Sequence, residues 1–143
     1  NINREGLTNI NFYEPVAKRS VPELLNVANA LFLIQGNVQW GSMNKLFDYM
    51  ASGKPIISAV SAMHNSPLDD MEYNFKVTDF KEDQVVLNIN RIKQLQNVEI
   101  ENIKNNQIGL VWEKYDISIL VNKLEKLLFE SLTSNEGQSG YNT

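Results

Sequence analysis

The residues best suited to chemistry lie in one short stretch, WGSMNKLFDYMASGKP, at positions 40–55. It opens with a turn that contains Gly41 and Ser42, which are small enough for a ligand to approach the backbone. A helix is predicted to follow, from about Met43 to Ser52, with Gly53 ending it as a C′ glycine and with Leu46, Phe47 and Met50 in the core. Its first amides would have no partner and would lie at the positive end of the helix dipole, where phosphate groups commonly bind. The stretch therefore predicts an anion site.

Two charged side chains on this predicted helix suit different parts of a ligand. Lys45 can place a positive charge against a phosphate oxygen. Asp48 would repel that phosphate, so it is better suited to accept hydrogen bonds from the hydroxyls of a ribose diol. Phosphate and diol together indicate a nucleotide. The spacing also fits a simpler interpretation, in which Ser42 only caps the helix and the two charges form an exposed i,i+3 ion pair.

The elements that must position this stretch are predicted from apolar patterning. Ala30–Ile34 is a continuous apolar run, typical of a parallel strand covered on both faces, and Pro55–Val60 is a second such run. Further strands are predicted at Asn9–Tyr13 and Asn74–Val77, and a short helix at Pro22–Ala28. The alternation indicates an α/β fold with a parallel sheet, in which ligands bind beyond the carboxyl ends of the strands.

The C-terminal half is predicted to be helical. The expected helices cover Lys81–Gln94, then about Val98 to Lys114, then a segment capped by Asp116. The residues expected to face inward are Val85, Ile89, Ile92, Ile100, Ile103, Leu110, Val111, Ile117, Leu120, Val121, Leu124, Leu127 and Leu128. Trp112 is expected in the core or in helix packing. Residues 131–143, which are rich in serine, asparagine and glycine, are predicted to be disordered.

Composition narrows the classes of protein. The chain has 143 residues with 43% hydrophobic and 21% charged residues, which is typical of one soluble globular domain. A net charge of -4 argues against nucleic acid as a partner. The absence of cysteine and the single histidine, His64, exclude thiolate and multi-histidine metal sites. No apolar run approaches the roughly 18 residues of a membrane-spanning helix, and a cytoplasmic location is expected.

The stretch from Gly41 to Pro55 resembles the donor-site segment of family 4 glycosyltransferases, which have the GT-B fold. In the bacterial polysaccharide branch this segment typically reads SPNKLFEYMAAGKP. Weaker agreement is found in NINF at 9–12, PELL at 22–25, ANA at 28–30, NSP at 65–67 and YD at 115–116. The resemblance covers roughly Asn9 to Leu128.

This resemblance implies a fold and a function. Residues 1–130 would form part of the C-terminal, Rossmann-like half of a GT-B enzyme, and residues 131–143 a tail. The full-length enzyme would transfer a sugar from a nucleoside-diphosphate sugar, commonly of uridine or guanosine, to a polysaccharide or lipid-linked acceptor. It would retain anomeric configuration and use no metal and no other cofactor. An N-terminal half would bind the acceptor, and the enzyme could associate with the inner face of the membrane.

The resemblance also assigns roles to residues, although it identifies no catalytic residue. The backbone of Ser42, Met43 and Asn44, together with Gly41, would lie beside the diphosphate. Asp48 would contact the ribose. A lysine at the position of Lys45 is shared with this branch, and its charge suits the phosphate.

The sequence departs from the family pattern in three places. Trp40 stands eight residues before Asp48, where the family often has the first of two acids, and Glu14 stands where it often has glycine. The glycine-rich strand and helix that open the family's domain are not in this sequence. We therefore expect that the chain alone transfers no sugar, and that open strand edges favour poor folding or pairing. Trp40 also leaves open a non-catalytic nucleotide-binding or interaction module.

Other polar residues have simpler explanations. His64 is expected to be a loop histidine, and the alternative is that it contacts the sugar or acts as an acid-base group. Asp69, Asp70 and Glu72 are expected to form the solvated start of a short helix rather than a cation site. A dehydrogenase-like or response-regulator-like domain is disfavoured because the sequence has no GxGxxG motif.

Overall fold

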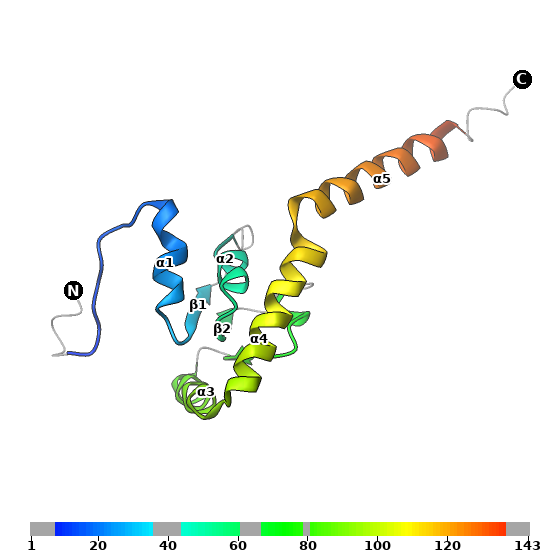
Figure 1. Cartoon of the computed structure of the whole chain (residues 1–143). Helices are drawn as coiled ribbons and strands as arrows, with labels where there is room; N and C mark the ends of the chain where they lie inside the picture. The colour runs from blue at the N-terminus through cyan, green and yellow to red at the C-terminus, as the bar shows by residue number, and fades with distance from the viewer. Residues whose placement is uncertain (1–7, 36–43, 61–66, 79–80, 137–143) are drawn as a thin grey trace, which may run out of the picture.

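The protein is a mixed α/β structure with a small sheet and a long projecting helix (Figure 1). The computed structural model describes residues 8–35, 44–60, 67–78 and 81–136. The sheet consists of parallel strands in the order β1 (Leu31–Gln35), β2 (Ile56–Val60) and β3 (Phe75–Lys76). The predicted α/β class with a parallel sheet is confirmed, and the arrangement is compatible with part of a Rossmann-like fold.

Helices connect and cover these strands. They are α1 (Val21–Asn26), α2 (Asn44–Ser52), α3 (Glu82–Gln94), α4 (Asn97–Leu110) and α5 (Ile117–Glu136), with 3₁₀ turns η2 (Lys18–Ser20) and η3 (Pro67–Asp69) and a π-helical turn η4 (Val111–Tyr115). The predicted helix at 98–114 is thus an α-helix that ends in a π turn. Asp116 caps α5 as predicted, because its carboxylate accepts a hydrogen bond of 2.9 Å from the Ser118 amide.

One core cluster fixes α2 against the sheet. It consists of Leu33, Leu46, Met50, Ile56, Leu68 and Met71. Leu46 and Met50 lie four residues apart, on the same face of α2, and both are fully buried. Phe47 packs at the edge of this cluster, with its ring 5.2 Å from that of Tyr115. The predicted core side of this helix is therefore confirmed.

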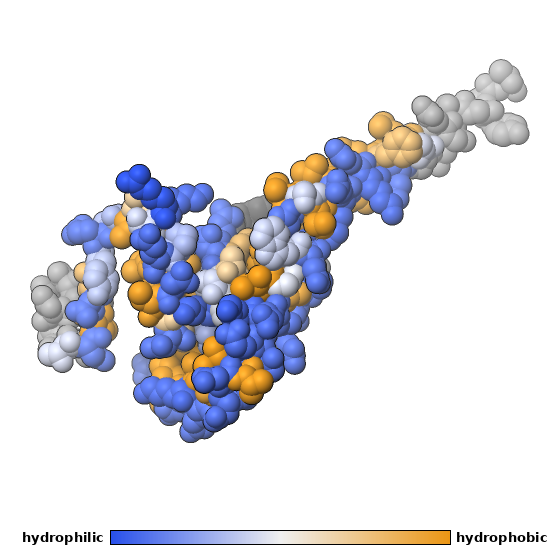
Figure 2. All heavy atoms as spheres, in the orientation of Figure 1, coloured by the Kyte–Doolittle hydropathy of each residue, from blue (hydrophilic) through white to orange (hydrophobic). Residues whose placement is uncertain are grey.

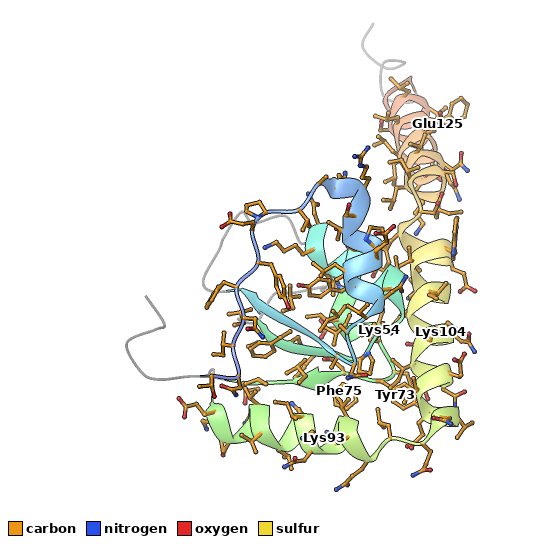
Figure 3. All side chains as sticks on the ribbon, turned by 60° about the vertical axis from the view of Figure 1, so that its left-hand side comes forward. Lys54, Tyr73, Phe75, Lys93, Lys104 and Glu125 are labelled. Atoms are coloured by element: carbon orange, nitrogen blue, oxygen red, sulfur yellow. The ribbon has the colours of Figure 1, made fainter. Side chains whose placement is uncertain are left out.

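A second core cluster lies on the opposite face of the sheet. It consists of Ile57, Ala59, Phe75, Val77 and Ile103, with Val85 and Ile92 of α3 packed against it. Ile57 follows Ile56 of the first cluster, and successive side chains of a strand point to opposite faces. Figure 3 shows α3 beside β3, on the side away from α1 and α2, and the Arg91 guanidinium lies 5.5 Å from the Phe75 ring centre.

The strand predicted at Asn9–Tyr13 is not formed. Residues 11–17 are neither helix nor strand, and Phe12 and Tyr13 are 74% and 77% exposed. A β-prone sequence becomes a strand only where a neighbouring strand and a packed face receive it. Among the described residues this segment has neither, so the local signal was misleading.

Several helical residues that were predicted to face inward are exposed. Ile89 and Ile100 lie on the outer sides of α3 and α4, and Trp112 is 66% exposed rather than part of the core. The apolar face predicted for α5 exists, but its residues are also exposed. Helix α5 continues through residues 131–136 of the segment that was predicted to be disordered, and residues 137–143 lie outside the described part.

Gly53 ends α2 in the left-handed conformation that was predicted for it. Its φ is 67°, and its amide donates a hydrogen bond of 3.0 Å to the Met50 carbonyl. A Cβ at this position would lie 2.5 Å from Cγ of Lys104 on α4. Glycine is therefore required both for the backbone angle and for the close approach of α2 and α4.

Candidate functional site

The predicted site residues that the structure describes are exposed on α2. Asn44, Lys45 and Asp48 point away from the core, because Leu46 and Met50 occupy its buried side. Gly41, Ser42 and Met43 lie outside the described residues, as do Trp40 and His64. Within the described part of the chain, Lys45 and Asp48 form no ion pair with each other, which removes one simple explanation for their spacing.

Asp48 lines a groove between α1 and α2 that has a volume of about 330 Å³. The lining residues are Lys18, Val21, Pro22, Leu25, Asn26, Asp48, Ala51 and Ser52. Ligand pockets usually have volumes of ~300–1,000 Å³, so this groove is large enough for a nucleoside-sized group. Its walls combine apolar side chains with a cation, a carboxylate and an amide.

The two charged residues predicted for the site, Lys45 and Asp48, do not line the same groove. Asp48 lines the groove, whereas the residues that line it do not include Lys45. The positive charge in the groove comes instead from Lys18 of η2, which the sequence analysis did not select. The Ser52 hydroxyl is already engaged, since it donates a hydrogen bond of 2.6 Å to the Tyr49 carbonyl. No side-chain hydrogen bond between described residues engages Asp48 or Asn26.

Lys18 and Asn26 could have been found only through the packing of α1 against α2. They flank the PELL helix at its two ends, and nothing in that helix predicts which side meets α2. Pro22 in the first turn of α1 does predict where this helix begins. With the contact between α1 and α2 known, the residues at the two ends of α1 become candidates.

A separate polar cluster holds η4 against the loop after η3. The Tyr115 hydroxyl donates a hydrogen bond of 2.6 Å to Asp70, and Lys114 Nζ lies 3.2 Å from the same carboxylate. The hydrogen bond from Tyr115 and then that from Lys114 lower the pKa of Asp70. Burial and the bond to Asp70 raise the pKa of Tyr115 to about 12. Asp69 pairs with Lys76 at 2.6 Å, so these acids bind cationic side chains of the same chain.

We expect this cluster to make stability fall at high pH. The folded protein holds the Tyr115 proton up to about pH 12, whereas the usual pKa of a tyrosine hydroxyl is 10.0. The stabilisation is therefore complete below pH 10.0 and is lost as the pH rises toward 12. Tyr115→Phe should remove this contribution to the fall in unfolding free energy, which urea unfolding at pH values from 10.0 to about 12 would measure. Tyr13→Phe, which removes an exposed hydroxyl, should keep it, and equal slopes for wild type and Tyr115→Phe would contradict the assignment.

None of the described helices combines the length and the apolar character needed to cross a membrane. In the described ranges, no cluster of three or more His, Asp or Glu residues could hold a metal ion.

Comparison with known proteins returned no relative. No protein-family model, curated protein or solved structure matches this chain. The resemblance to family 4 glycosyltransferases therefore stays a prediction that rests on the sequence motif.

Proposed function

We propose that this chain is the donor-binding part of a retaining glycosyltransferase. It would bind a nucleoside-diphosphate sugar, with Asp48 accepting hydrogen bonds from the ribose hydroxyls. Gly41, Ser42, Met43 and Asn44 would surround the diphosphate at the start of α2, and Lys45 would neutralise part of its charge. The sugar would pass to a polysaccharide or lipid-linked acceptor bound by another domain, in the cytoplasm and at the inner face of the membrane.

The observation that best supports this proposal is the position of Asp48. It is the residue that the motif assigns to the ribose. Its side chain lines a groove of nucleoside size and forms no ion pair with Lys45. The apolar side chains of Val21, Pro22 and Leu25 on one wall suit the face of a base, and Lys18 adds positive charge. A carboxylate beside an apolar wall is a common way to hold a nucleoside.

The proposal predicts that neutralising Asp48 weakens nucleotide binding. A hydrogen bond to a charged group contributes about 1.5–3 kcal/mol, so Asp48→Asn should raise the Kd for uridine or guanosine diphosphate by roughly 10- to 100-fold. Isothermal titration calorimetry on the 143-residue chain would measure this change. Glu23→Gln is a matched control, because it removes an exposed carboxylate from α1 outside the groove lining.

Two results would contradict the assignment. One is an unchanged Kd in Asp48→Asn while circular dichroism shows the native helix content. The other is an equal loss of nucleotide affinity in Glu23→Gln, which would mean that the effect comes from the change in net charge and not from a contact with Asp48.

A non-catalytic binding or interaction module is the second candidate. It is favoured by Trp40 at the first acidic position and by the surface of β1, where Phe32 and Ile34 are exposed. Exposed apolar side chains on an edge strand are typical of a surface that pairs with another chain. A protein joining this chain to an acceptor-binding half would separate the candidates: sugar transfer supports the enzyme, and nucleotide binding without transfer supports the module.

A further inference from the structure

Helix α5 carries a continuous apolar band that faces solvent. The band consists of Ile117, Leu120, Val121, Leu124, Leu127, Leu128 and Leu132, which are 42% to 73% exposed. Their spacing repeats at three and four residues, so they share one side of the helix. Figure 2 shows apolar side chains along α5 beside hydrophilic ones, and Figure 1 shows the helix extending beyond the rest of the molecule.

This band is too long to be left uncovered. At 1.5 Å per residue, the 20 residues of α5 extend about 30 Å. Most of the stability of a helix in a protein comes from packing its apolar face. Within the described part of the chain, η4 is the element that makes more than marginal contact with α5. A large exposed apolar surface of this kind indicates a binding partner.

The charges of α5 favour a second copy of the same chain over a membrane surface. Lys123 and Lys126 are outnumbered by Glu125, Glu130 and Glu136, whereas helices that lie on anionic membranes carry an excess of basic residues. The small excess of one acid leaves only weak net repulsion between two identical helices. A specific interface needs on the order of 800 Å² from each partner, and an apolar band along the whole helix supplies an area of that order.

We propose that two copies of this chain dimerise through α5, with the helices antiparallel. Lys123 and Glu130 are seven residues apart, so they lie on the same flank of the apolar band. In an antiparallel pair centred between them, Lys123 of one copy lies opposite Glu130 of the other, and the contact occurs twice by symmetry. The same register brings Leu124 of one copy against Leu128 of the other. A parallel pair would leave these opposite charges apart.

The first test is the mass of the protein in solution. Sedimentation equilibrium of the full chain at micromolar concentration should give twice its 16.3 kDa. Leu124→Glu places a charge in the centre of the apolar band and should weaken association at least a hundredfold. Because this residue is exposed in the single copy, far-UV circular dichroism should still show the folded α/β body.

The second test uses the charge pairs and gives the orientation. Lys123→Glu and Glu130→Lys should each weaken self-association by about tenfold, because each creates two repulsive contacts. An equimolar mixture of the two variants should recover dimers, since their charges are complementary in the antiparallel arrangement. Lys93→Glu on α3 is the matched control, because it makes the same charge change far from α5 (Figure 3) and should leave the dimer intact.

Three results would overturn the proposal. A chain that stays at 16.3 kDa at high micromolar concentration excludes the dimer. A monomer that binds phosphatidylglycerol vesicles, and loses that binding in Leu124→Glu, assigns the band to a membrane. A dimer that persists in Leu124→Glu, or a variant mixture that stays as weak as its components, places the contact elsewhere, for example at the open edge of β1.

Discussion

Leu46→Ala is expected to destabilise the protein by about 2–5 kcal/mol. Leu46 is fully buried and joins α2 to both Leu33 and Ile56 of the sheet through one core cluster. Truncation removes its apolar contacts and leaves a cavity that the surrounding strands cannot close. Because domains of this size are stable by only about 5–15 kcal/mol, the variant should lose a large part of its free energy of unfolding.

Urea unfolding followed by circular dichroism would measure this loss. Leu87→Ala is the matched control. It is the same leucine-to-alanine change in a helix, but the Leu87 side chain is 59% exposed. It should change stability by less than about 1 kcal/mol. Similar losses in the two variants would mean that α2 does not anchor the sheet as described. Leu46→Ala should also weaken nucleotide binding, since Leu46 fixes the helix that carries Asp48.

Gly53→Ala is expected to destabilise the protein through two separable causes. A left-handed backbone angle costs an L-residue roughly 1–2 kcal/mol, and φ is 67° here. In addition, the new Cβ would lie 2.5 Å from Cγ of Lys104 and 3.2 Å from its Cα, so α4 must shift. The total loss should exceed the cost of the backbone angle alone.

Two further variants separate these causes. Lys104→Ala removes the nearest clashing atom, so the loss caused by Gly53→Ala should shrink in that background but not vanish. Gly109→Ala makes the same change within α4, where a Cβ would meet nothing within 4 Å. It should stabilise the protein by about 0.5–1 kcal/mol, because alanine is the better helix former. A loss in Gly109→Ala, or none in Gly53→Ala, would contradict this account of the contact between α2 and α4.

The parts of the fold that the sequence predicted are those with a strong local cause. β1 and β2 were recognisable because a continuous apolar run needs cover on both faces, and both strands pair in parallel. The end of α2 was recognisable because a glycine suits the left-handed position after a helix. Leu46 and Met50 were recognisable as core because their spacing places them on one side of that helix.

The predictions that failed depend on which other part of the structure packs against a helix or strand. The segment at 9–13 has β-prone residues, but a strand requires a neighbour that the local sequence does not specify. The apolar period of α5 predicted the helix correctly, yet the pattern shows only that its band needs cover and not which molecule provides it. Trp112 was expected in the core or in helix packing, but its side chain is 66% exposed on η4.

The candidate site shows the same division. Lys45 and Asp48 could be selected as site residues because both lie on one predicted helix, where the sequence alone gives their charges and their spacing. The groove and Lys18 could not, since they depend on how α1 packs against α2. The roles proposed for Gly41, Ser42 and Met43 rest on the sequence motif alone.

The pairing of β1 with β2 has a consequence for the order of folding. Leu31 pairs with Ile56, and the chain between them includes α2, so strand pairing and helix packing must be completed together. Long-range parallel pairing is slow because it requires closure of a long loop. We therefore expect the unit of β1, α2 and β2 to be structured in the folding transition state, while α5 forms later. The helix that carries Asp48 would then be among the earliest parts of the chain to reach its native arrangement.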